Sequence, residues 1–196
     1  GRAVWTGVVR ACSRLAVPHG GQSPAGVPFT RSPASVRDQR RLWDAMSAST
    51  LGQVAVIEHR PALAMIEAFG LDVSSLALDM TNFATYIDTG NDKAPIAQRG
   101  KAKQKRADLR LVGLGLVVTR DGGIPLVSHA YPGNRPDVTQ FATMIDLLAG
   151  RHAALAAQTS APTPAEVTVV FDAGQNSVAN FTHLAEAGLA FVGSVP

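Results

Sequence analysis

One stretch constrains the fold of this chain more than any other, the run over 109–131. Two apolar segments, LRLVGLGLVVT and IPLVSHAY, flank the tetrapeptide RDGG. A short glycine-containing turn between two β-rich segments is a strong signal for a β-hairpin. The chain is therefore expected to contain an antiparallel pair of strands on which the neighbouring segments pack.

The segments around this hairpin complete a mixed sheet. A strand is predicted over 76–86, before the hairpin, and a helix over 138–158, after it. The strand VTVVFD, a helix over 177–187 and the strand LAFVGSV follow. The first three strands form a meander, whereas the last two arrive through helical crossovers, lie parallel to each other and can lie beside the first strand. The sequence thus predicts an α/β fold with a mixed five-stranded sheet and flanking helices.

The helix over 138–158 should supply much of the core. Asp137 is its expected N-terminal signal, because a short acidic side chain can accept hydrogen bonds from the first free amides of a helix. Its apolar positions recur at helical spacing, and we expect them to face the sheet: Phe141, Met144, Ile145, Leu148 and Leu155.

The N-terminal third divides into two parts. Residues 1–35 are rich in Gly, Pro, Ser and Arg without periodicity, and are expected to form an arm without regular structure. Residues 36–70 predict two helices, the second interrupted or kinked near Pro61 and stopped by Gly70. The sheet domain then occupies 71–196.

Composition excludes several classes of protein. A hydrophobic fraction of 46% and a charged fraction of 17% are ordinary for a globular chain of 196 residues. No apolar run approaches the ~18 residues needed to span a bilayer, and no signal peptide is recognisable. The single cysteine, Cys12, excludes an internal disulfide framework and a cysteine-rich zinc site. A cytoplasmic protein is expected.

The net charge of +3 hides two basic patches. Residues 1–41 hold seven arginines against one acid, and residues 93–110 hold seven basic residues against one acid. The rest of the chain has four basic residues and thirteen acids. Basic patches on an acidic body favour binding of a polyanion such as nucleic acid, although a solvated loop accounts for a lysine run equally well.

Two carboxylates stand at unusual places in the strand candidates. Asp79 lies inside an apolar run, and Asp172 ends VTVVFD. A buried, unpaired carboxylate is costly, so each must be paired or lie where a strand opens onto a site. On neighbouring strands ~4.8 Å apart the two could share Mg²⁺ or Mn²⁺. Taken singly, Asp79 also fits a strand edge, and Asp172 a turn or helix cap.

Three segments resemble the DDE transposases of bacterial insertion sequences, in the IS-four-like group. They are LDMTNF around Asp79, GLGLVVTRDGGIPLVSHAYPGNRPD, and VVFDAGQNS around Asp172, and the resemblance covers about residues 38–196. It implies an RNase H-like fold and metal-dependent cleavage and joining of DNA during transposition. It also implies that Asp79 and Asp172 are catalytic carboxylates that hold Mg²⁺ or Mn²⁺.

The family pattern includes a third acid, a glutamate on a later helix. After Asp172 the sequence has only Glu186, on the helix between the last two strands, and the role is not assigned to it. The chain begins with Gly1 and stops within a strand candidate, so a truncated fragment, inactive by itself, is expected. Two alternatives stay open: an RNase H-like nuclease or resolvase without strand transfer, and a DNA-binding remnant without catalysis.

The basic loop completes the expected DNA site. Lys101, Lys103, Lys105 and Arg106 are expected to bind phosphate, which contributes affinity but no sequence reading. The resemblance implies element ends and target DNA as partners, a location at the nucleoid, and a homo-oligomer on paired ends. Four other polar residues are interpreted as turn or structural residues: Asn134, Arg135, His129 and His183.

Overall fold

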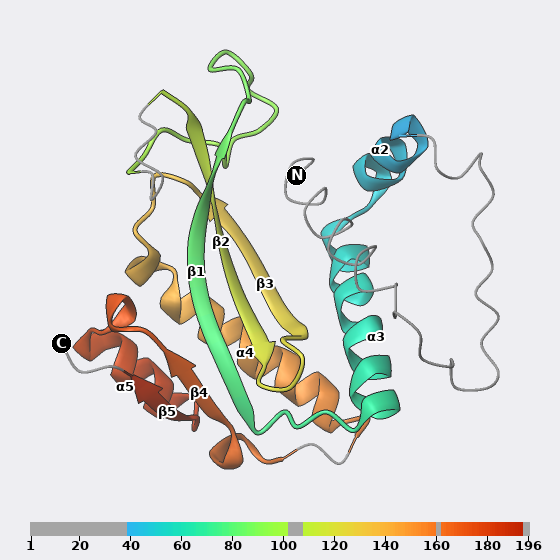
Figure 1. Cartoon of the computed structure of the whole chain (residues 1–196), viewed down its shortest axis with the longest axis vertical. Coiled ribbons are helices and arrows are strands. Elements are labelled where there is room, and N and C mark those ends of the chain that lie inside the picture. The colour runs from blue at the N-terminus through green and yellow to red at the C-terminus, as the bar shows by residue number, and fades with distance from the viewer. Residues whose placement is uncertain (1–38, 102–107, 160–161, 194–196) are drawn as a thin grey trace. The chain divides into compact units, whose positions relative to one another are not determined.

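The computed structural model describes residues 39–101, 108–159 and 162–193 (Figure 1). The chain forms two compact units, residues 1–54 and residues 55–196. The arm expected over 1–35 lies outside the described residues. The described part of the first unit holds helix α2 (Gln39–Ala48) and the start of helix α3 (Leu51–Phe69).

Helix α3 continues through Pro61, where an interruption or a kink was expected. Proline removes one amide and leaves the carbonyl four residues earlier without its helical partner. That carbonyl belongs to Ile57, which is 48% exposed, so water can satisfy it. The helix ends where predicted, because Gly70 adopts a φ of +58°, a left-handed conformation that stops the helix.

The second unit is built on a single five-stranded sheet with the order β3-β2-β1-β4-β5. The strands are β1 (Ser75–Thr85), β2 (Arg110–Thr119), β3 (Pro125–Pro132), β4 (Thr168–Phe171) and β5 (Ala190–Gly193). Strand β2 is antiparallel to both of its neighbours, while β4 is parallel to β1 and to β5. The predicted mixed sheet is confirmed, including the placement of the fourth strand beside the first.

The predicted hairpin joins β2 and β3. Gly122 and Gly123 both have positive φ in its turn, which explains why the sequence places two glycines there. Strands β1 and β2 pair without a break from Leu76 opposite Thr119 to Thr85 opposite Arg110. This long antiparallel ladder fixes which side chains of β1 face each side of the sheet.

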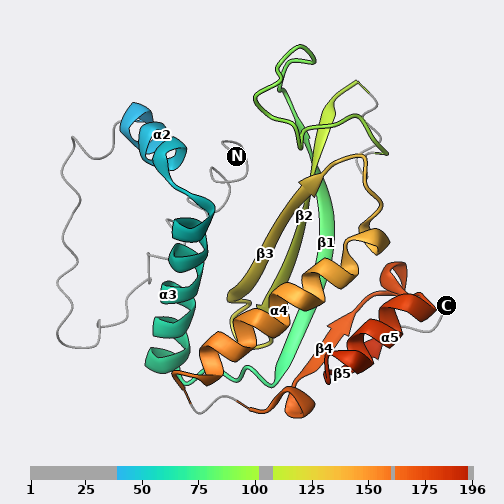
Figure 2. The ribbon, with the colours of Figure 1, turned by 180° about the vertical axis from the view of Figure 1, so that it is seen from behind.

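Helix α4 (Phe141–Ala156) covers one face of the sheet (Figure 2). The five apolar positions predicted for it are buried, and four of them, Phe141, Met144, Ile145 and Leu148, pack with the inward residues of β1 and β4 in one core. Helix α5 (Val178–Glu186) begins where predicted, because the Ser177 side chain accepts a hydrogen bond from the Asn180 amide. Helix α4 also contacts α5.

The predicted role of Asp137 at the start of the long helix is wrong. Helix α4 begins at Phe141, and a short 3-10 turn, Asp137–Thr139, precedes it. The Asp137 carboxylate instead accepts a hydrogen bond from the Tyr131 hydroxyl, at 2.7 Å. A buried hydroxyl needs a partner, and this tertiary requirement outweighs the local preference for a helix cap.

Candidate functional site

Asp79 lies on the face of β1 that the main core does not occupy. Leu76, Leu78 and Met80 are buried, whereas Ala77 and Asp79 are exposed. Successive side chains of a strand point to opposite faces, so the carboxylate is carried outward while its neighbours fill the core. This alternation explains how an apolar strand accommodates an acid. Figure 1 views the sheet from the side opposite α4.

Asp172 follows the last residue of β4, on that same face. In the register of the two parallel strands, Ala77 of β1 pairs with Val170 of β4. Two residues further along both parallel strands come Asp79 and Asp172. Val170 is 42% exposed and Asp172 is exposed, so the outward face continues from one strand to the other. Extending the register brings the two acids to neighbouring positions, on strands ~4.8 Å apart.

The Asp79 carboxylate is turned toward β4. The Thr168 amide donates to the Ser74 carbonyl, so the even-numbered residues of β1 direct their backbone groups toward β4. The amide of one of them, Met80, donates to Asp79 Oδ1 at 2.8 Å. The carboxylate oxygen therefore lies on the side of β1 where β4 ends and Asp172 begins.

Asp172 also closes a turn, as its sequence context suggested. Its Oδ1 accepts a hydrogen bond from the Gly174 amide at 3.0 Å, at the start of the 3-10 turn Ala173–Gln175. This bond engages one oxygen and orients the side chain, while the residue stays exposed. The turn interpretation and the ligand interpretation of Asp172 are therefore compatible.

The donor set fits a hard divalent cation. Mg²⁺ is typically held through one or two carboxylates, with water or phosphate oxygens completing its coordination. Asp79 and Asp172 offer such oxygens at an exposed position. Among the described residues, no three His, Cys, Asp or Glu side chains cluster as a set that could hold a metal ion. Any metal held here would have to complete its shell with water or substrate oxygens.

The expected phosphate-binding lysines belong to the loop between β1 and β2. Lys101 is exposed, and its carbonyl accepts a hydrogen bond from the Asn82 side chain at 3.2 Å. Lys103, Lys105 and Arg106 lie outside the described residues.

Sequence reasoning missed the part played by Arg110, which it counted only as one charge of the basic patch. Arg110 is 9% exposed, and its guanidinium donates to carbonyls of the preceding loop. The available signal was its place at the boundary between the basic loop and an apolar strand.

The four polar residues interpreted as turn or structural residues either contact another side chain or lie exposed in a turn. His183 Nε2 lies 2.7 Å from Asp146 Oδ1. The ring of His129 stacks on that of Tyr131, with centroids 5.8 Å apart. Asn134 and Arg135 are exposed in the turn after β3.

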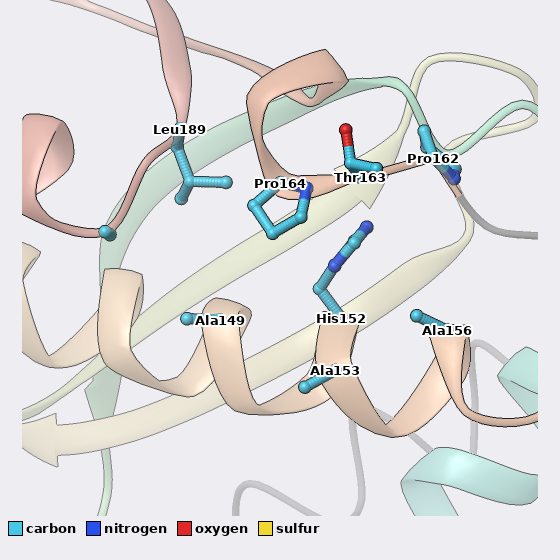
Figure 3. Close-up of a pocket in the computed structure, with 9 residues that line it drawn as sticks. Ala149, His152, Ala153, Ala156, Pro162, Thr163, Pro164 and Leu189 are labelled. Carbon is cyan, nitrogen blue, oxygen red and sulfur yellow. The ribbon is translucent and has the colours of Figure 1, made fainter.

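A cavity of about 360 Å³ lies at the amino ends of β4 and β5, the opposite end of β4 from Asp172. Alanines, prolines and Leu189 line it, together with His152 (Figure 3). The His152 side chain points from α4 toward Pro162 and Thr163, and its buried Nε2 has no hydrogen-bond partner in the structure. With only two polar side chains, His152 and Thr163, and no carboxylate in its lining, this cavity lacks the ligands expected of the candidate site.

No helix in the described part of the chain combines the length and the hydrophobicity that crossing a membrane requires.

Comparison with known proteins gives likenesses of fold only. No protein-family model matches the chain, and no curated protein matches it. Among solved structures, it is similar to a Mos1 transposase paired-end complex with left transposon end, with 9% identity and a TM-score of 0.40 over 95% of this chain. It is also similar to a pre-cleavage Mos1 transpososome, with 10% identity and a TM-score of 0.39 over 94% of this chain.

A third similar structure is the Mos1 mariner paired end complex with Mn, with 12% identity and a TM-score of 0.36 over 93% of this chain. The chain covers 49%, 50% and 49% of these three chains, so it spans about half of their length.

Proposed function

We propose that residues 71–196 form the RNase H-like core of a DDE transposase of the IS-four-like group, which cleaves and joins DNA with divalent metal ions. The observation that supports this most is the register of the two parallel strands. Extended two residues beyond the pairing of Ala77 with Val170, this register would bring Asp79 and Asp172 to neighbouring positions on the exposed face. Carboxylates at the carboxyl end of a parallel strand occupy the usual location of a site in an open α/β sheet.

In this proposal Asp79 and Asp172 hold Mg²⁺ or Mn²⁺. When bound, the ion supplies positive charge that activates a water molecule and stabilises the leaving oxygen of a phosphodiester. The two carboxylates position the ion, and the hydrogen bonds from the Met80 and Gly174 amides orient them. The basic loop, beginning with Lys101, binds the DNA backbone. Solved structures similar to this chain include transposase complexes, one of them with Mn.

Titration calorimetry with Mn²⁺ tests the metal assignment. We expect Asp79→Asn and Asp172→Asn each to lower Mn²⁺ affinity at least tenfold, because each removes one charged ligand. Asparagine retains a carbonyl oxygen that can accept from Gly174, so Asp172→Asn preserves the turn. The matched control is Asp121→Asn, which neutralises an exposed acid in the β2–β3 turn. Unchanged affinity in both site variants contradicts the metal assignment.

A second function is a DNA-binding protein without catalysis. The observation that favours it is the group of exposed basic residues in the loop before β2, such as Arg99 and Lys101, which can bind phosphates without a metal. Nicking of supercoiled plasmid in Mg²⁺ or Mn²⁺ separates the two functions: salt-sensitive binding without nicking supports the second. Joined DNA products distinguish a transposase from a nuclease or resolvase, which would yield cleavage alone.

A further inference from the structure

The loop between β1 and β2 is organised around the side chain of Arg110. Its Nη1 donates to the carbonyls of Asp88 at 2.8 Å and Asn91 at 3.0 Å. Its Nη2 lies 3.5 Å from the Ala94 carbonyl, and its Nε donates to the Ala97 carbonyl. Four backbone carbonyls of the loop thus contact one guanidinium at the start of β2.

Only arginine can make this set of contacts. The guanidinium presents five donors in a fixed plane, whereas the lysine ammonium has three donors at a single point. The end of the loop is also paired with β2: Gln98 and Leu111 exchange backbone hydrogen bonds of 2.9 and 2.7 Å. The loop up to Lys101 is therefore anchored to the sheet through Arg110 and this bridge.

A second contact fixes the loop against the turn that follows β3. The Gly133 amide donates to the Ile96 carbonyl at 3.1 Å. A methyl group at Gly100 would collide with the Gly133 carbonyl and lie 3.0 Å from Asn134 Cα. The two backbones thus approach as closely as only glycine permits.

This approach brings three exposed cations onto adjacent segments. Arg99 and Lys101 flank Gly100, and Arg135 follows Gly133 by two residues. The carboxylate closest to Arg135 in sequence, Asp137, accepts a hydrogen bond from the Tyr131 hydroxyl.

We propose that Arg99, Lys101 and Arg135 form one binding surface for the sugar-phosphate backbone of DNA, and that Arg110 is the residue that positions it. This deepens the proposed function and rests on it for the identity of the ligand. Arginine and lysine side chains that neutralise phosphates dominate the affinity of proteins for DNA. Arg110, being buried, contacts no phosphate and acts only through the loop.

Fluorescence anisotropy with a random-sequence DNA duplex, in EDTA and over 50–200 mM salt, tests the surface on the full chain. We expect Arg99→Gln, Lys101→Gln and Arg135→Gln each to weaken binding several-fold and to lower the slope of log K against log salt by about 1. Arg120→Gln is the control, because it removes the same charge from an exposed residue at the other end of β2. Equal losses in Arg120→Gln and Arg135→Gln would overturn the surface.

Arg110→Lys tests the positioning role separately, since it keeps the charge. We expect a several-fold loss of DNA affinity together with faster hydrogen exchange over 88–101, while the circular dichroism of the sheet stays unchanged. Affinity and exchange equal to the wild type would overturn the role of Arg110. Should Arg110→Lys fail to fold, Gly100→Ala provides the second probe: its methyl group must separate loop and turn, and undiminished affinity there would overturn the shared surface.

The metal-free assay keeps this proposal distinct from the proposed function. DNA binding that follows the expected pattern without Mn²⁺ binding at Asp79 and Asp172 would contradict the enzyme and leave the surface intact. Mn²⁺ binding and nicking with unaltered DNA affinity in the three surface variants would contradict the surface and leave the proposed enzyme intact.

Discussion

At the scale of single residues, Tyr131 shows how the core constrains a polar group. Its buried ring lies against β2 at Gly113, and its hydroxyl donates to Asp137. Burial raises the pKa of the Tyr131 hydroxyl well above its usual value, and the hydrogen bond to Asp137 and the charges of Asp137 and Asp79 raise this pKa further. The folded state therefore favours the protonated form of the Tyr131 hydroxyl.

This pKa shift predicts a loss of stability at alkaline pH. Because the folded pKa of Tyr131 lies above the unfolded value, its contribution is complete below about pH 10 and is lost as pH rises beyond that. Urea unfolding between pH 8 and 11 should show a free energy of unfolding that falls above pH 10. In Tyr131→Phe the free energy should be lower at pH 8 and should fall less steeply. Parallel curves for the two proteins would contradict the assignment.

His152 gives a second prediction at this scale. Its side chain is 5% exposed, and its Nε2 is buried without a hydrogen-bond partner in the structure. An unsatisfied buried polar atom costs about 1–3 kcal/mol, so His152→Leu should raise the free energy of unfolding by roughly 1 kcal/mol. That corresponds to a Tm about 2–4 °C higher for a chain of this size.

The control for this substitution is His183→Leu. It removes a partnered histidine from the neighbourhood of Asp146 and should not raise Tm. A His152→Leu protein that melts at or below the wild-type temperature would mean that the imidazole is satisfied in solution, for example by water in the cavity.

At the scale of elements, two glycines of β2, Gly113 and Gly115, allow the strand to pack closely. A methyl group at Gly113 would collide with the Tyr131 ring, whereas one at Gly115 would lie 2.6 Å from Met144 Sδ. The ring is fixed at both ends, by the strand and by its bond to Asp137. The thioether of Met144 belongs to a flexible side chain that can change rotamer.

Alanine substitutions at these two positions should therefore differ. Overpacking costs about 1–3 kcal/mol where the neighbours cannot relax. We expect Gly113→Ala to lie at the upper end of this range, and Gly115→Ala to lose less stability. Urea unfolding monitored by circular dichroism measures both, each serving as the control for the other. Equal losses, or a larger loss for Gly115→Ala, would contradict this account of the helix–sheet contact.

The elements were largely predictable because their signals are local. Alternating apolar residues, the RDGG turn and the helical spacing of Phe141 to Leu155 each act within a few residues. The errors arose where a tertiary contact determines what a side chain does. The Asp137 carboxylate accepts a hydrogen bond from the Tyr131 hydroxyl and does not cap the helix. Likewise Arg110 organises carbonyls 13 to 22 residues before it, which no local pattern reveals.

The candidate site was predictable in position more than in detail. Asp79 and Asp172 were expected on neighbouring strands, and the pairing of Ala77 with Val170 agrees with that expectation. The orientation of their carboxylates depends on where β4 stops and on the turn at Gly174. The turn at Gly174 is local and fits its sequence context. The end of β4 follows from the assembled sheet, so sequence patterns could not supply it.

At the scale of the whole molecule, the site depends on the folded sheet. Asp79 and Asp172 are 93 residues apart in the sequence, and in the proposed site they would come together only through the pairing of β1 with β4. A ligand that binds the native state alone stabilises it by mass action, by about 2.7 kcal/mol at a concentration of 100 times its Kd. Mn²⁺ should therefore stabilise the protein if the two acids hold it.

A thermal melt with and without Mn²⁺ measures this coupling. At about 100 times the Kd we expect Tm to rise by roughly 5–10 °C in the wild type, since each kcal/mol shifts Tm by about 2–4 °C. The rise should persist in Asp121→Asn and shrink to about half or less in Asp79→Asn and Asp172→Asn, since a tenfold loss of affinity leaves about 1.4 kcal/mol of the stabilisation. A rise of the same size in both site variants would show that Mn²⁺ binds elsewhere. No rise in the wild type at saturating Mn²⁺ would show that the sheet alone does not assemble a metal site.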